Sequence, residues 1–304
     1  MLFKLGIMYA LILVGIVIRR RVKGIDGFTK VISKLLINVL VPVVIFSSTM
    51  QFSITLIDVR IILFSCSIFF FSSVLAYVFL RILRLKGDAV GPFVLNSVNA
   101  NQLYLPLPII FALYGSVGLA YSTLFLFIFN VATTFYFIPL YSYYSSERRK
   151  KGTFLLRFLL FPPFIASVLG LISLSLSYTF PQQVVQPASY IGQLTTYLAL
   201  LFVGLNIKLE RGNWLSRPVL GVSAIRLLIL PLLIFGLLKS LGLIEIWGSI
   251  LIIHAGMPPA VNNIIFTDYY GLDKKLTATI VAETTLFTLL TLPLLIFLGE
   301  SIVQ

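Results

Sequence analysis

Two polar, proline-containing stretches interrupt long apolar segments at corresponding places in the two halves of this chain. They are residues 99–108 (NANQLYLPLP) and residues 254–263 (HAGMPPAVNN). Proline removes a backbone donor and clashes with the preceding turn, so each helix should break there. In lipid, a broken helix is tolerated only where protein or a water-filled cavity covers the freed backbone groups. The sequence therefore predicts two broken membrane helices whose breaks lie inside the protein.

The composition indicates a polytopic membrane protein. Hydrophobic residues make up 59% of the 304 residues, and charged residues make up only 11%, whereas a soluble domain carries about 25%. The net charge of +13 could suggest nucleic-acid binding, but the basic residues lie between apolar segments, which is typical of topology signals. Cys66 is the single cysteine, so an intrachain disulfide is excluded.

Ten apolar segments have roughly the 20 residues that a bilayer requires. They cover residues 2–18, 29–50, 57–80, 89–114, 118–141, 153–176, 187–207, 217–241, 246–268 and 276–298. Seventeen of the 23 Lys and Arg residues follow odd-numbered spans, whereas the N-terminus and the opposite loops hold only Lys4, Arg60 and Lys239. The positive-inside rule then places both termini outside, in the cell membrane. Arg19 to Arg21 follow the first apolar segment, so we interpret it as a retained span and not a signal peptide.

The predicted fold is all-α, with two inverted repeats of five helices. The first repeat covers residues 1–141, a short cytosolic loop covers 142–152, and the second repeat covers 153–304. Because five is odd, the second repeat enters the membrane in the opposite sense. Matching fragments support the repeat: an Ile-Ile-Phe triplet and then a Tyr-Gly pair follow each break in the same order.

Several motifs resemble those of the auxin efflux carrier family. The stretch from Asn101 to Leu119 resembles the family's fourth span, and the stretch from Gly256 to Asp273 resembles its ninth. The stretch from Thr284 to Leu294 resembles its tenth, and the similarity covers the whole chain. This resemblance implies a fold like that of bile-acid sodium symporters, with crossing broken helices four and nine. It also implies export of organic anions by an elevator-type movement, in which spans one, two, six and seven form a scaffold and a homodimer contact.

The two breaks supply the candidate substrate site. Proline suits a first helical position, so a new half-helix should begin after each break. Helix N-termini carry unsatisfied N–H groups and partial positive charge, which favours a carboxylate. The predicted substrate-binding residues are Asn101, Gln102, Pro106, Pro258, Pro259, Asn262 and Asn263. The alternative interpretation is that the amides only cap the broken backbone.

A second group of residues could couple transport to an ion. Glu283 is the one carboxylate well inside a predicted span, so it is a candidate to carry H+ or to bind Na+. The alternative is a structural ion pair with Lys34 or Arg226; Arg226 itself could instead attract an anion. The other coupling candidates are Thr284, His254, Asn130 and Thr134. A resident metal or other cofactor is not expected, beyond a possible Na+ near Glu283.

These observations predict a secondary transporter that exports a small organic anion, such as an auxin-like carboxylate or a dicarboxylate. The chain lacks a serine–histidine–acid set, a phosphate-binding loop and a Cys/His cluster, so an enzyme is not expected. The partners expected are the anion, the lipid bilayer and a second copy of the chain, without nucleic acid. Two alternatives remain open: a sodium-coupled symporter of the bile-acid type, and a receptor that binds an anion without moving it.

Overall fold

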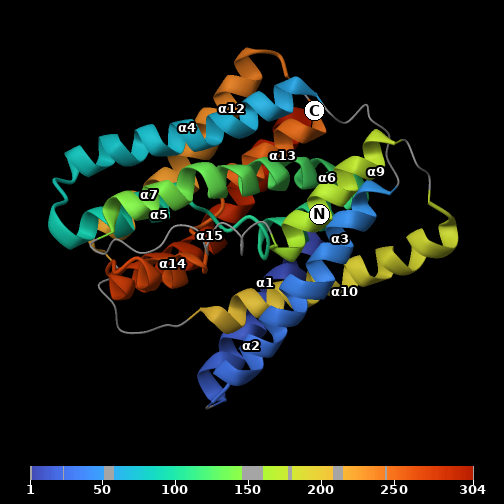
Figure 1. The fold of residues 1–304 in the computed structure, drawn as a ribbon, viewed down its shortest axis with the longest axis horizontal. Helices are drawn as coiled ribbons and strands as arrows, with labels where there is room; N and C mark the ends of the chain where they lie inside the picture. The colour runs from blue at the N-terminus through green and yellow to red at the C-terminus, as the bar shows by residue number, and fades with distance from the viewer. Residues whose placement is uncertain are drawn as a thin grey trace. The chain divides into compact units, whose positions relative to one another are not determined.

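The computed structural model describes residues 2–22, 24–50, 58–145, 160–176, 180–207, 215–243 and 245–303 (Figure 1). Every regular element in these residues is helical, which confirms the predicted all-α class. The α-helices are α1 (Leu2–Arg21), α2 (Asp26–Leu35), α3 (Val41–Thr49), α4 (Val59–Ile82), α5 (Val90–Val98), α6 (Pro106–Ala132), α7 (Ile138–Tyr144), α9 (Pro162–Ser175), α10 (Gln182–Asn206), α11 (Arg217–Ala224), α12 (Leu230–Ser240), α13 (Ile246–Ala255), α14 (Asn263–Tyr269) and α15 (Lys274–Val303). A short 3₁₀ turn, η3 (Gly87–Ala89), precedes α5.

Within the described residues, six helical stretches are long and apolar enough to cross a membrane, which supports an integral membrane protein. They are Asp26–Thr49, Val59–Ile82, Pro106–Tyr144, Gln182–Asn206, Arg217–Ser240 and Lys274–Val303. Two shorter apolar helices, Pro162–Ser173 and Ile246–Ala255, fall in the predicted sixth and ninth spans. The count of ten spans and the inverted repeat remain predictions. Residues 146–159, which include most of the predicted central loop, lie outside the described residues.

In the part of the chain that the structure describes, three membrane helices contain a π-helical turn, and each turn ends two residues before a proline. These turns are η1 (Leu36–Leu40), η4 (Thr133–Phe137) and η5 (Ile225–Ile229), followed by Pro42, Pro139 and Pro231. A proline ring clashes with the carbonyl of the preceding turn and cannot donate to it. A wider turn relieves the clash while the helix continues. Pro42, Pro139 and Pro231 are therefore accommodated within continuing helices by a wider turn, whereas the prolines at 106 and 258–259 accompany breaks.

Gly115 marks a sharp kink within α6. Its φ of 60° and ψ of −147° are not helical, and they lie in a region that L side chains rarely adopt. The kink falls between the predicted fourth span, 89–114, and the predicted fifth, 118–141. The structure thus joins the end of one predicted span to the next through a single glycine.

The chain forms two compact units, and each unit takes segments from both halves of the sequence. Unit 1 comprises residues 1–59, 103–127 and 153–208, and unit 2 comprises residues 60–102, 128–152 and 209–304. The helices of predicted spans one, two, six and seven belong to unit 1. Those of spans three, eight, nine and ten belong to unit 2, while spans four and five are divided between the units.

Unit 1 is organised around α10, which packs against α1, α2 and α3 (Figure 1). Gly15 of α1 and Gly204 of α10 allow the two backbones to approach closely. A Cβ on Gly15 would clash with the main chain of Leu201, and a Cβ on Gly204 would clash with the main chain of Ile12. Small residues of this kind let membrane helices pack tightly without a hydrophobic driving force.

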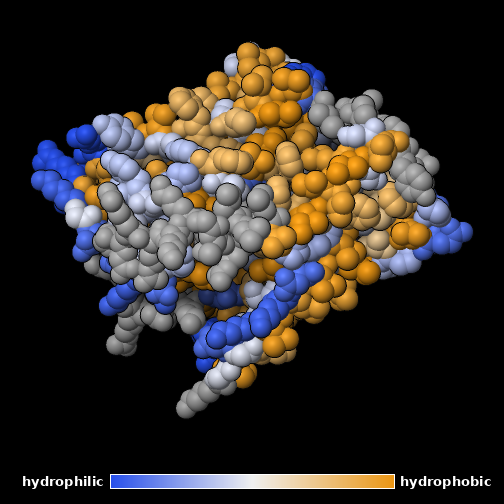
Figure 2. Space-filling view, in the orientation of Figure 1, coloured by the Kyte–Doolittle hydropathy of each residue, from blue (hydrophilic) through white to orange (hydrophobic). Residues whose placement is uncertain are grey.

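Unit 2 is organised around α15, which packs against α5, α11, α12, α13 and α14. The side chain of Leu295 lies so close to Gly256 that a Cβ there would clash with it. Outside these contacts, large apolar side chains remain exposed, among them Leu63, Phe70, Leu290 and Phe297. Hydrophobic residues cover much of the face shown in Figure 2, as expected for helices that contact lipid.

Candidate functional site

The predicted break in the fourth span is present. Helix α5 ends at Val98, and Asn99 adopts an extended conformation with φ −90° and ψ 102°. The chain resumes a helix at Pro106, the first residue of α6, as predicted from the suitability of proline for that position. Residues 99–102 belong to unit 2, whereas Pro106 belongs to unit 1.

The predicted break in the ninth span is also present, entirely within unit 2. Helix α13 ends at Ala255, and α14 begins at Asn263. The second half-helix therefore begins four residues after Pro259 and not directly after it, which corrects the sequence expectation. Pro258 and Pro259 instead lie in the extended connection between the half-helices.

The two unwound segments of unit 2 run antiparallel and are hydrogen-bonded to each other. Ala100 and Pro259 form an isolated β-bridge. The Asn101 N–H donates to the Pro258 carbonyl at 2.7 Å, and the Ala260 N–H donates to the Asn99 carbonyl at 3.1 Å. Each segment thus satisfies backbone groups that the broken helix of the other leaves open, as burial in a membrane requires. We call this contact the crossing.

A closed cluster of four side chains holds the crossing together. In this amide cluster (Asn96, Asn99, Tyr141 and Asn263), Asn263 Oδ1 accepts from Asn99 Nδ2 at 2.8 Å and from the Tyr141 hydroxyl at 2.7 Å. Asn263 Nδ2 donates to Asn96 Oδ1 at 3.0 Å and to the Asn99 carbonyl at 2.9 Å. These four bonds fill the hydrogen-bonding capacity of the Asn263 amide. Asn263 therefore acts as a structural connector in this conformation.

His254 and Gln102 form a second link across the crossing. Gln102 Nε2 donates to the His254 carbonyl at 3.2 Å, and His254 Nδ1 lies 2.7 Å from Gln102 Oε1. Because the amide oxygen can only accept, Nδ1 carries the proton in this arrangement. Both side chains are buried. The structure thus brings these two predicted residues into one contact.

Arg226 places a buried positive charge beside the break of the ninth span. It lies in η5, the π-helical turn that precedes Pro231, and is 1% exposed. Its Nε donates to the Met257 carbonyl at 3.0 Å, and its Nη2 donates to the His254 carbonyl at 3.4 Å. Carbonyls at a helix C-terminus carry partial negative charge, which favours a cation there. Within the described residues, Arg226 has no carboxylate partner.

Glu283 is a buried carboxylate on α15. It is 3% exposed, and its Oε2 has no hydrogen-bond partner among the described residues. The hypothesis of an ion pair with Arg226 is therefore wrong for this structure, and Lys34 is exposed on α2 of unit 1. Next to Glu283, Thr284 Oγ1 lies 3.1 Å from Ser223 Oγ of α11.

The remaining predicted residues differ in their burial and in the hydrogen bonds that they make. Asn262 is half-buried in the turn that leads into α14, with φ −63° and ψ −17°, and its side chain makes no hydrogen bond within the described residues. Asn101 is buried, and its backbone N–H supports the crossing. Asn130 is buried in α6, and Thr134 donates to the Asn130 carbonyl within its own helical segment at 3.1 Å.

Sequence reasoning missed three members of the amide cluster. Asn96 lies just before the fourth-span break and Asn99 is its first residue, so their amides were a usable signal. Tyr141 comes from near the end of the predicted fifth span, and its aromatic ring offered no reason to place it at the crossing. Only the fold brings it within 2.7 Å of Asn263.

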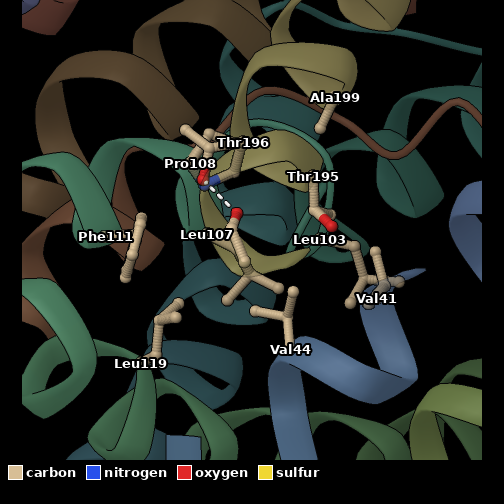
Figure 3. Close-up of a pocket in the computed structure, with 11 residues that line it drawn as sticks. Val41, Val44, Leu103, Leu107, Pro108, Phe111, Leu119, Thr195, Thr196 and Ala199 are labelled. Carbon is tan, nitrogen blue, oxygen red and sulfur yellow. Dashed lines mark hydrogen bonds between the residues drawn. The ribbon is translucent and has the colours of Figure 1, made fainter. Parts of the chain in front are cut away.

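Unit 1 contains a separate, partly open apolar pocket whose free volume of about 10 Å³ is roughly room for one water molecule (Figure 3). Its lining comes from α3, α6 and α10 and from the segment before α6: Val41, Val44, Leu103, Leu107, Pro108, Phe111, Leu119, Gly192, Thr195, Thr196 and Ala199. The hydroxyls of Thr195 and Thr196 donate to carbonyls of their own helix, at 2.6 and 3.0 Å. The pocket therefore presents an apolar surface.

An all-helical membrane chain with two helices broken at a buried polar crossing is typical of secondary transporters. A family model described as membrane transport protein matches residues 26–296. The chain therefore belongs to this family, which confirms the resemblance to auxin efflux carriers.

Two archaeal relatives support this assignment, and both are named uncharacterized transporters. The protein from Methanocaldococcus jannaschii is 24% identical over 302 residues, covering 95% of this chain and 96% of the relative. The protein from Methanothermobacter thermautotrophicus is 25% identical over 290 residues, covering 93% of each chain. The family and these relatives are membrane transporters and not enzymes.

Proposed function

We propose that this protein is a secondary transporter that exports a small organic anion, bound at the crossing in unit 2. The observation that carries the proposal is Arg226, a buried cation without a carboxylate partner in the described residues, bonded to carbonyls at the ninth-span break. Two of its three guanidinium nitrogens donate to carbonyls, whereas Nη1 has no hydrogen-bond partner there. A guanidinium suits a carboxylate because its N–H groups match the carboxylate oxygens.

Asn262 supplies a neutral group for the same ligand. Its amide is half-buried and uncommitted among the described residues, whereas the amide of Asn263 is saturated. An anion bound at the crossing would thus meet one charged and one neutral donor. Export follows from the family resemblance and not from this geometry.

The division into units supports an elevator-type movement. Arg226, Glu283, the amide cluster and both sides of the crossing all belong to unit 2. A site built within one compact unit can move with that unit. In this proposal unit 2 carries the anion, unit 1 forms the scaffold, and a homodimer contact lies on unit 1.

The test is anion binding and flux with purified protein. Thermal stabilisation by benzoate and by succinate is measured with and without Na+, and labelled anion is then followed into proteoliposomes. Asn262→Leu should weaken binding at least tenfold, because a lost hydrogen bond to a charged group is worth about 1.5–3 kcal/mol. Asn206→Leu is the control, since Asn206 is half-buried on α10 of unit 1 and bonds its own helix at 2.8 Å.

Each outcome has a clear meaning. No binding of either anion would contradict the proposed function, and binding without flux would indicate a receptor. A strict requirement for Na+ would favour the sodium-coupled alternative. Equal binding by Asn262→Leu and the control would move the ligand away from the crossing.

The proposed orientation has its own test. After Cys66 is replaced, a cysteine at Lys275 should be labelled only from the cytosolic side, and one at Lys239 only from outside. Both positions are exposed: Lys275 lies just before predicted span ten, and Lys239 lies in the last residues of predicted span eight. Labelling of both from the same side would contradict the ten-span topology with external termini.

A further inference from the structure

Unit 2 buries two opposite charges that do not form an ion pair with each other. Glu283 is 3% exposed and Arg226 is 1% exposed. Arg226 donates instead to the Met257 and His254 carbonyls, and Glu283 Oε2 has no partner within the described residues. An uncompensated charge inside a protein costs several kcal/mol, so such a pair needs an explanation.

The two charges belong to neighbouring helical segments. Helix α15 packs against both α11 and η5, and Ser223 Oγ lies 3.1 Å from Thr284 Oγ1. Arg226 is three residues from Ser223, and Glu283 directly precedes Thr284, so both lie within about one helical turn of that contact. The low dielectric of the interior lets charges influence one another beyond hydrogen-bond distance.

Other titratable groups near α15 are few, and the charged ones are exposed. The elements packed against α15 are α5, α11, η5, α12, α13 and α14. Besides Arg226 they carry Arg217, Lys239, His254, Asp268 and Tyr269, and α5 carries none. Asp268 pairs with Lys274 at 3.2 Å on the surface. His254 is the one buried rival for a proton, and its Nδ1 is engaged with Gln102.

The summed charge of Arg226, Glu283 and a bound anion indicates that anion binding is accompanied by uptake of a proton. With Glu283 ionised and Arg226 protonated, the empty site is neutral. A monovalent anion beside Arg226 would leave it with one uncompensated negative charge. Protonation of Glu283 restores neutrality, because an O–H bond forms on its carboxylate with a proton from the aqueous side to which the site is open.

We propose that Glu283 takes up one proton whenever a monovalent organic anion binds at the crossing, so that anion and proton cross the membrane together. This inference rests on the proposed function and adds the coupling ion and the preferred ligand charge. The loaded and the empty site are then both neutral, so unit 2 carries no net charge at the site when it crosses the membrane in either form. A dianion such as succinate would leave one negative charge uncompensated and should bind more weakly than benzoate.

The experiment measures proton uptake when benzoate binds to the purified protein, with a pH-sensitive dye in weakly buffered solution. We expect about one proton per bound benzoate near neutral pH. Benzoate affinity should fall about tenfold for each pH unit over the range where Glu283 is ionised in the empty protein. Binding heats in two buffers of different ionisation enthalpy give an independent count. The wild-type measurement stands without any variant.

The variant Glu283→Gln tests whether Glu283 is the residue that takes up the proton. The amide imitates the protonated carboxyl group, so this variant should bind benzoate without proton uptake and without the pH dependence. Glu300→Gln is the matched control on the same helix, since Glu300 is half-buried near its end. The control should keep the wild-type proton count.

Several outcomes would overturn the inference. Benzoate binding without proton uptake in the wild type, or with Na+ uptake in place of the proton, would contradict it while leaving the proposed function intact. Uptake that persists in Glu283→Gln but disappears in His254→Gln would transfer the proton to His254. Tighter binding of succinate than of benzoate would contradict the charge argument. Failure of both anions to bind would instead contradict the proposed function.

Discussion

The amide cluster and the surroundings of Arg226 lie in the same unit but use their polar groups differently. In the amide cluster, Asn263 has all four hydrogen-bonding positions filled. In the described residues, Glu283 Oε2 is buried without a hydrogen-bond partner, Arg226 donates only through Nε and Nη2, and the Asn262 side chain makes no hydrogen bond. Saturated polar groups stabilise a single conformation, whereas unsaturated buried groups are costly and suit a ligand.

This difference in hydrogen bonding indicates which amides hold the crossing together and which could bind a ligand. Asn262 and Asn263 are adjacent at the ninth-span break, and sequence position alone gives them equal standing. Their hydrogen bonds separate a structural set from a set that remains available. The following changes test that separation, beginning with the largest expected effect.

Asn263→Leu should destabilise the protein most. It removes four hydrogen bonds and leaves the partner groups of Asn96, Asn99 and Tyr141 unsatisfied in the interior. Each such group costs about 1–3 kcal/mol, so the total loss should exceed about 3 kcal/mol. Thermal unfolding of the ligand-free protein measures this, with Asn206→Leu as control. A variant as stable as the control would contradict the structural role of the amide cluster.

Arg226→Gln should reduce anion binding more than it reduces stability. Its expected loss of affinity for benzoate is tenfold to more than hundredfold, since a hydrogen bond to a charged group contributes about 1.5–3 kcal/mol. Arg226→Lys keeps the charge and should bind benzoate better than the Gln variant. Equal affinities in titrations of the two folded variants would show that the charge does not serve binding.

Tyr141→Phe tests the amide cluster more gently. It removes the hydroxyl that donates to Asn263 Oδ1 at 2.7 Å and keeps the ring packed against Phe266. We expect a loss of about 1 kcal/mol in the free energy of unfolding, with unchanged benzoate affinity. A tenfold loss of affinity at unchanged stability would place Tyr141 among the ligand-binding groups.

Ser223→Ala should have the smallest effect. It removes the contact with Thr284 Oγ1 at 3.1 Å, and hydrogen bonds between membrane helices average about 0.6 kcal/mol. Proton uptake and benzoate binding should persist, since neither charge is altered. Loss of proton uptake in this variant would show that the position of Glu283 depends on the serine.

The sequence by itself determined the class, the family and the two breaks. Apolar segments of membrane-spanning length and prolines inside them have local consequences: the segments enter lipid, and a proline cannot donate a helical hydrogen bond. The start of α6 at Pro106 follows the same rule. The kink at Gly115 falls at the predicted boundary between the fourth span, 89–114, and the fifth, 118–141.

Only the tertiary structure decided which polar groups are paired. Tyr141 and Asn263 are 122 residues apart in the chain, and Arg226 meets carbonyls 28 and 31 residues away. Distances between helices cannot be read from the sequence, so an Arg226–Glu283 ion pair and two separate charges both stayed open. Helix packing around α15 and the widened turn before Pro231 settle that Arg226 contacts the carbonyls at the end of α13, because a hydrogen bond forms only where donor and acceptor are brought within about 3 Å.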